Sequence, residues 1–279
     1  MKTLKLGYSP CPNDTFIFYA MVHGKIETLD LYFNEMLLDV EELNRKAINK
    51  ELDLSKVSYN VFGHVSREYL FLRSGGALGR GCGPLLIAKK RYSINELKGK
   101  IIAVPGIHTT AYLLLQLLSP SVIRESSILE VPFNEIINSV SNGTVDAGLI
   151  IHESRFTYAL YGLHKIVDLG EWWEGETGLP IPLGGIIARR SLGYELTGRI
   201  NSIIKTSIEY AYSHRSEPMN YIQENSQELS SDIINQHINL YVNDYSFDIG
   251  DDGEKAAREL LLRAANAGIM QKVKGNIFI

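Results

Sequence analysis

Short apolar runs alternate with segments of helical periodicity through the first half of the chain. Strands are expected at residues 4–8, 32–38, 54–57, 85–88, 101–104, 128–131 and 147–151, and again at residues 184–188 in the second half. Helices are expected at residues 15–22, 40–50, 110–118 and 135–140, and after Glu153. Strands that alternate with helices predict an α/β protein with mostly parallel sheets.

The order of these segments predicts two lobes. Residues 89–186 hold a complete set of strands and helices, whereas residues 194–269 have an almost wholly helical pattern. We therefore expect a discontinuous first lobe (1–88 and 187–279) and an inserted second lobe (89–186), with a hinge near Ile87 and Ile187. This layout resembles the type II periplasmic-binding-protein fold, which implies a ligand cleft between the lobes.

Composition narrows the function classes. The 279 residues carry a net charge of −4, and no basic run is longer than Lys89-Lys90-Arg91, so nucleic acid is not an expected partner. No apolar run approaches the roughly 18 residues of a membrane span. Lys5 interrupts the apolar N-terminus, which argues against a signal peptide and for a cytoplasmic location.

The sequence offers little for metal or thiol chemistry. Cys11 and Cys82 are too few for a disulfide framework, and we expect neither a disulfide nor a catalytic thiol. No His, Cys or carboxylate cluster has metal-ligand spacing, so no metal is expected.

Polar residues gather where predicted strands meet predicted helices. Four such turns lie at residues 9–15, 56–60, 105–110 and 152–155. Ligands of open α/β sheets bind beyond the carboxyl ends of strands, where helix N-termini favour anions. The expected partner is therefore a small anionic organic molecule. Each of these residues also has an explanation that involves no ligand: Thr109 and Ser58 could be helix caps, and Lys56 a solvated surface lysine.

His152 directly follows a predicted core strand. Because imidazole titrates near neutral pH, His152 suits general acid–base chemistry, although a helix-capping or simply hydrogen-bonded histidine is an alternative. Trp172, Trp173 and Tyr8 are candidates for an aromatic wall or for packing. Their roles, and that of Asn13, stay open.

Several motifs carry a family resemblance. Residues 9–16 read SPCPNDTF, and KVS at 56–58, GCGPL at 81–85, GIHTT at 106–110 and IHE at 151–153 follow in order. Together they resemble the 1,4-dihydroxy-6-naphthoate synthases of the futalosine route to menaquinone, over nearly the full chain. The first motif is the most specific.

The resemblance implies a reaction and its residues. Members of the family convert cyclic dehypoxanthinyl futalosine into 1,4-dihydroxy-6-naphthoate, as lyases that cleave a carbon–carbon bond without a cofactor. The catalytic base carries over onto His152. Substrate binding carries over onto two groups of residues: Lys56, Val57 and Ser58, and Thr109 and Thr110.

Two alternatives stay open at this point. Chorismate dehydratase of the same pathway shares the fold, although the motif at residues 9–16 and His152 argue against it. A non-catalytic binding protein for small anions is the other alternative, because fold does not decide function. The sequence carries no signal of an oligomeric state.

Overall fold

A computed structural model describes residues 2–226 and 230–279, and it divides the chain into two compact units. Unit 1 comprises residues 1–79 and 182–279, and unit 2 comprises residues 80–181. Each unit has its own sheet and its own apolar core. No helix among the described residues is long and apolar enough to cross a membrane.

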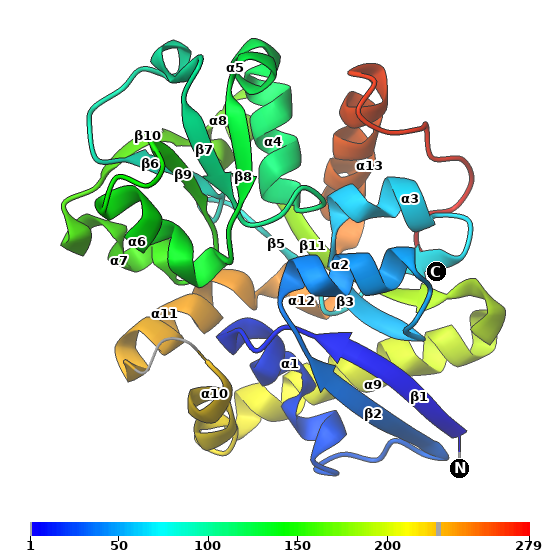
Figure 1. The fold of residues 1–279 in the computed structure, drawn as a ribbon. Helices are drawn as coiled ribbons and strands as arrows, with labels where there is room; N and C mark the ends of the chain where they lie inside the picture. Colours follow the sequence, from blue (N-terminus) through cyan, green and yellow to red (C-terminus); the bar gives the residue numbers. More distant parts are fainter. Residues whose placement is uncertain (1, 227–229) are drawn as a thin grey trace. The chain divides into compact units, whose positions relative to one another are not determined.

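The sheet of unit 1 has six strands (Figure 1). They are β1 (Lys2–Tyr8), β2 (Leu31–Leu37), β3 (Leu54–Ser58), β4 (Tyr69–Phe71), β5 (Ala77–Gly79) and β11 (Ile181–Arg189). Their order is β2-β1-β3-β11-β4, and β5 also pairs with β11. β1 is parallel to β2 and β3, whereas β11 is antiparallel to β3 and β4.

Helices supply the rest of unit 1. They are α1 (Pro12–Val22), α2 (Val40–Ile48), α3 (Phe62–Val65), α9 (Tyr194–Ser213), α10 (Met219–Asn225), α11 (Ser231–Tyr241), α12 (Asp244–Phe247) and α13 (Gly250–Asn266), with short 3₁₀ turns η1 (Tyr59–Val61) and η5 (Arg190–Leu192). α1 is buried on nearly every face because α9, α10 and α11 pack around it. Its run of apolar residues suits a helix that is enclosed on all sides.

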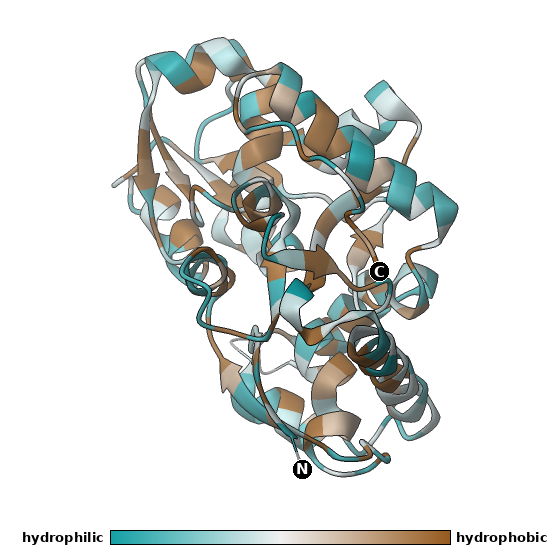
Figure 2. Cartoon of the chain, turned by 90° about the vertical axis from the view of Figure 1, so that its right-hand side faces the viewer, coloured by the Kyte–Doolittle hydropathy of each residue, from teal (hydrophilic) through white to brown (hydrophobic). Residues whose placement is uncertain are grey.

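The sheet of unit 2 has five strands in the order β10-β6-β9-β7-β8. They are β6 (Leu85–Ala88), β7 (Ile101–Val104), β8 (Ser127–Glu130), β9 (Ala147–Ile150) and β10 (His164–Asp168). The helices are α4 (Thr110–Leu118), α5 (Pro120–Glu125), α6 (Ile136–Ser141), α7 (Ser154–Thr157) and α8 (Leu169–Thr177), with 3₁₀ turns η2 (Ile94–Leu97), η3 (Phe133–Glu135) and η4 (Tyr158–Tyr161). Colouring by hydropathy shows brown, hydrophobic residues in strands and on parts of the helices (Figure 2).

The α/β class and the predicted strands agree with this architecture. Pairing is parallel for β1 with β2 and β3, and for β7 with β8 and β9. It is antiparallel for β6 with β9 and β10, and for β11 with β3 and β4, so the expectation of mostly parallel sheets is only partly correct. Three strands were missed, β4, β5 and β10. β4 and β5 are only three residues long, which is too short to show a periodic pattern, and β10 is half-exposed over most of its length and lacks a strong apolar pattern.

The predicted lobe boundaries differ from the observed division. The structure divides the chain after residues 79 and 181, whereas the sequence suggested residues 88 and 186. The difference arises because β6 pairs with β9 and β10, which places residues 85–88 in the sheet of unit 2. Long-range pairing of this kind leaves no mark in the local sequence.

The backbone just before β6 lies against the backbone at the start of α8, where Gly83 meets Gly170. A Cβ atom added to Gly83 would lie 2.1 Å from the amide nitrogen of Gly170, near the start of α8. A Cβ atom at Gly170 would lie 2.8 Å from the amide nitrogen of Gly83. Glycine at both positions therefore allows the two segments to touch.

We expect Gly83→Ala to lower the free energy of unfolding by about 1–3 kcal/mol, because the added methyl group overpacks this contact. Gly175→Ala is the matched control, since a Cβ atom there meets nothing within 4 Å. Urea denaturation followed by circular dichroism measures both. Equal stability of the two variants would contradict the close-approach argument.

Candidate functional site

The first strand-to-helix turn of unit 1 is built around the carboxylate of Asp14. Asp14 Oδ2 accepts hydrogen bonds from Ser9 Oγ at 2.8 Å and from the Ser9 amide at 3.2 Å. Asn13 Nδ2 donates to Asp14 Oδ1 at 2.8 Å. Pro12 occupies the first turn of α1, where its missing N–H costs nothing. The motif thus folds into a turn whose polar groups satisfy one another.

Lys56 at the end of β3 completes this turn. Its Nζ lies 2.9 Å from Asp14 Oδ1 and donates to the carbonyl oxygen of Gly75 at 2.7 Å. Asp14 is 2% exposed and Lys56 is 5% exposed, so the explanation of Lys56 as a solvated surface lysine is wrong. Such a buried ion pair depends on further hydrogen bonds, which the Gly75 carbonyl oxygen supplies to Lys56 and which Ser9 and Asn13 supply to Asp14.

The two residues after Lys56 are held in different ways. Val57 is fully buried and is paired with Gly185 in the sheet. Ser58 donates its amide to Asn44 Oδ1 at 2.9 Å, and its Oγ accepts from Asn44 Nδ2 at 3.3 Å. The Ser58 side chain makes no capping hydrogen bond to η1, so the capping alternative for this residue is wrong.

A buried histidine that the sequence did not single out joins the same network. His237 of α11 is 1% exposed, and its Nε2 lies 2.9 Å from Asn13 Oδ1. Because the amide nitrogen of Asn13 donates to Asp14, Asn13 Oδ1 must accept, and His237 therefore carries a proton on Nε2. The spacing of α11 alone gave no signal for this contact.

In unit 2, the turn between β7 and α4 is closed by Thr109. Its Oγ1 donates to the Gly106 carbonyl oxygen at 2.7 Å and accepts from the Tyr112 amide at 3.2 Å. Thr109 is therefore the N-cap of α4, as one of the two sequence interpretations held. Thr110, the first residue of the helix, is 2% exposed.

His152 follows β9 with an unusual backbone. Its φ is +56°, which makes it one of three described non-glycine residues in the left-handed region. This conformation costs about 1–3 kcal/mol, and such residues cluster at functional sites. The imidazole packs edge-to-face on Phe133, with ring centroids 4.9 Å apart. The left-handed backbone therefore makes His152 the leading candidate for a functional residue of unit 2.

The loop that carries His152 is fixed by an arginine that the sequence did not single out. Arg155 Nη2 pairs with Asp168 Oδ2 at 2.9 Å, and Nη1 donates to the carbonyl oxygen of Gly83. Asp168 Oδ1 in turn accepts from the amides of Gly170 and Glu171, at the start of α8. The segment after His152 is thereby tied to β10, α8 and the start of β6.

The strand order of unit 2 brings Thr109 and His152, two residues predicted for the site, to the same edge of its sheet. β7 and β9 are parallel neighbours, with Ile102 opposite Ala147 and Ala103 opposite Gly148. Their carboxyl ends therefore point the same way, and the chain leaves them toward Thr109 and toward His152. In unit 1, Lys56 to Ser58 lie together at the end of β3, beside the first turn.

The other candidates from the sequence are mainly structural. Tyr8 is fully buried and stacks on Phe18 at 4.4 Å, and Trp173 is fully buried with Nε1 donating to the Pro180 carbonyl oxygen at 2.9 Å. Packing therefore explains both better than an aromatic wall. Trp172 is half-buried on α8.

The two cysteines are both buried, and neither forms a disulfide, as predicted. Burial raises the pKa of the Cys82 thiol to about 12. The thiolate is the nucleophilic form of cysteine, so Cys82 stays protonated and unreactive near neutral pH.

Comparison with known proteins gives a family match over most of the chain. The family model described as menaquinone biosynthesis matches residues 4–266. A Thermus thermophilus protein named 1,4-dihydroxy-6-naphtoate synthase is 47% identical over 279 residues, which cover 100% of both chains. A Streptomyces coelicolor protein of the same name is 45% identical over 273 residues, 96% of this chain and 95% of that protein.

Solved structures give the same fold at two levels of similarity. A crystal structure of an Archaeoglobus fulgidus protein has a TM-score of 0.89 and 36% identity, and the match covers 96% of this chain and 98% of that one. The periplasmic aliphatic sulphonate binding protein of Escherichia coli has a TM-score of 0.68 and 10% identity, with 100% and 94% covered. The fold is therefore that of periplasmic binding proteins.

The buried pair in unit 1 yields a stability prediction. We expect Lys56→Met or Asp14→Asn alone to lower the free energy of unfolding by about 3–5 kcal/mol, because each leaves a buried group without its partner. The double variant should cost less than the sum of the two single changes. Chemical denaturation of all three variants measures the coupling.

Lys46 provides the matched control. Its ion pair with Glu51, 2.7 Å long, lies at the surface, and Lys46→Met should leave stability close to that of the wild type. If Lys56→Met were no more costly than Lys46→Met, the buried pair would not have the structural role assigned to it.

Proposed function

The chain belongs to the menaquinone biosynthesis family, and we propose that it acts as a 1,4-dihydroxy-6-naphthoate synthase on cyclic dehypoxanthinyl futalosine. The enzyme releases the naphthoate together with a small fragment derived from the sugar. The reaction is a carbon–carbon bond cleavage that uses side chains of the protein and no cofactor.

The observation that carries this proposal is the position of His152. It follows the carboxyl end of β9 in a left-handed conformation, next to the turn that leaves the parallel strand β7. Function is the usual reason for a protein to retain such strain. A histidine held there is suited to take a proton from a bound molecule, because neutral imidazole is a base near neutral pH.

The proposed chemistry needs one base and a well-held substrate. His152 removes a proton from carbon, and the electron pair of that C–H bond becomes part of the forming ring. The carbon–carbon bond breaks with its electron pair on the departing fragment, which takes up a proton. Formation of the aromatic ring supplies driving force. The protein contributes by positioning the base against the substrate and by excluding water.

Substrate binding is assigned to two groups of residues. In unit 2, the N-terminus of α4 presents backbone N–H groups, and Thr110 adds a hydroxyl beside them, which suits a carboxylate. In unit 1, Ser58 and the backbone of Val57 offer polar groups at the end of β3. Lys56 contributes chiefly by holding Asp14 and the first turn, because two of its hydrogen bonds are made within unit 1.

The two alternatives from the sequence make different predictions in the same assay. A chorismate dehydratase would consume chorismate, and a binding protein would release no product from either compound. The similarity to sulphonate binding proteins, at 10% identity, bears on the fold alone. Full-length identity of 45% and 47% to proteins named as naphthoate synthases supports the enzyme.

We expect His152→Ala to lower the turnover of cyclic dehypoxanthinyl futalosine by about 10²–10⁴-fold, because a positioned base contributes that much. Folding and substrate affinity should change little. Naphthoate formation is followed by chromatography, with His164→Ala as a control histidine from the same unit. A His152→Ala enzyme that kept more than about a tenth of the wild-type rate would refute the base assignment.

The two neighbouring threonines should separate binding from stability. Thr110→Val keeps the shape of the side chain but removes the hydroxyl, and should weaken substrate binding by roughly 1–3 kcal/mol. Thr109→Val removes a helix cap, and should lower the free energy of unfolding by about 1 kcal/mol. Calorimetric titration and denaturation measure the two effects. Unchanged substrate affinity in Thr110→Val would remove Thr110 from the site.

A further inference from the structure

Unit 1 contains a cavity that the proposed reaction does not use. Its volume is about 1050 Å³. Residues 63–68 of α3 and the following turn, residues 268–276 after α13, Lys50 and Arg190 line it. The chain after α13, red in Figure 1, runs past α3 toward the C-terminus.

The lining of this cavity is strongly basic, although the chain as a whole has a net charge of −4. It includes five basic side chains: Lys50, Arg67, Arg190, Lys272 and Lys274. The acidic side chain is Glu68, and Lys50 neutralises it through an ion pair of 2.7 Å. Four cations of the cavity therefore have no carboxylate in its lining to balance their charge: Arg67, Arg190, Lys272 and Lys274.

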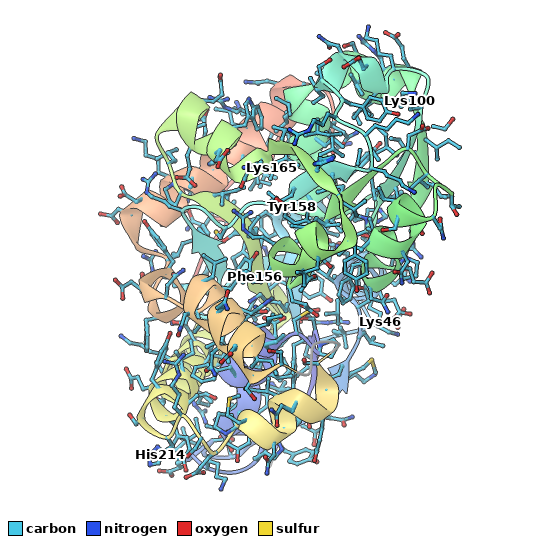
Figure 3. The ribbon with its side chains drawn as sticks, turned by 90° about the vertical axis from the view of Figure 1, so that its left-hand side faces the viewer. Lys46, Lys100, Phe156, Tyr158, Lys165 and His214 are labelled. Atoms are coloured by element: carbon cyan, nitrogen blue, oxygen red, sulfur yellow. The ribbon has the colours of Figure 1, made fainter. Side chains whose placement is uncertain are left out.

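Several other surface lysines of the protein have acidic partners. Lys46, Lys100 and Lys165, labelled in Figure 3, form ion pairs of 2.7, 3.7 and 3.3 Å with Glu51, Asp146 and Glu171. Among the residues that the structure describes, no ion pair involves the four remaining cations of the cavity. Their charges accumulate in one place, which favours occupation by an anion.

Arg190 gives the cavity a fixed donor. Its Nε donates to the Ser66 carbonyl oxygen at 3.1 Å, and its Nη2 donates to the Asn276 carbonyl oxygen at 2.8 Å. These bonds hold the guanidinium between the two segments that form the walls. An arginine held in this way loses little conformational entropy when it binds an anion.

The same cavity also has an apolar side. Ile269 and Met270 are half-buried and lie in its lining. Met270 packs on Gly63, where an added Cβ atom would lie 2.8 Å from its sulfur. A ligand with an organic body beside its charged group would find apolar contacts as well as cations.

We propose that this cavity binds a small phosphate-bearing molecule. A phosphate monoester carries nearly two negative charges near neutral pH and three acceptor oxygens, so it matches a cluster of several cations better than a single carboxylate does. Binding at this place is independent of the reaction assigned to His152.

Calorimetric titration of the full-length protein with two probes, inorganic pyrophosphate and ribose 5-phosphate, tests the proposal. The triple variant Arg67→Gln, Lys272→Gln, Lys274→Gln removes exposed cations only, and circular dichroism verifies its folding. The matched control is Lys90→Gln, Arg91→Gln, Arg124→Gln, which removes the same charge from exposed positions of unit 2.

We expect saturable binding of at least one probe to the wild type and the control, and affinity at least about tenfold lower in the cavity variant. Tighter binding of pyrophosphate would indicate an inorganic ligand, and tighter binding of ribose 5-phosphate would indicate an organic phosphate. Absence of saturable binding at millimolar concentration, or equal loss of affinity in both triple variants, would overturn the proposal.

Discussion

The buried ion pair between Lys56 and Asp14 is the interaction on which the functional part of unit 1 depends. It joins the end of β3 to the start of α1, and Lys56 extends the connection to the carbonyl oxygen of Gly75. Asp14 fixes Ser9 and Asn13, and Asn13 reaches His237 on α11. One charged pair thus orders a turn whose polar groups would otherwise be costly to bury.

Unit 2 depends on backbone geometry more than on charge. The parallel pairing of β7 with β9 directs two turns to the same edge of the sheet, one capped by Thr109 and one carrying His152. Arg155 and Asp168 anchor the segment after His152, and this anchoring offsets part of the cost of its left-handed backbone. The base that we propose is therefore held by the fold before any substrate binds.

Local patterns in the sequence were enough for some of this structure. Apolar runs followed by helical spacing placed most strands and helices, and the capping alternative for Thr109 agrees with its hydrogen bond to the Tyr112 amide. The burial of Lys56 was not predictable, because its partner Asp14 is far away in the sequence. The contact of His237 with Asn13 was not predictable either, because the two residues are far apart in the sequence. The predicted boundary at residue 88 was wrong because β6 pairs with β9, a strand that lies much later in the chain.

Product identity in a competition assay tests the central claim most directly. The purified protein is given cyclic dehypoxanthinyl futalosine and chorismate together, without added cofactor, and both compounds and their products are followed by mass spectrometry. We expect 1,4-dihydroxy-6-naphthoate to accumulate while chorismate stays intact. Consumption of chorismate, or binding of the futalosine derivative without conversion, would contradict the claim.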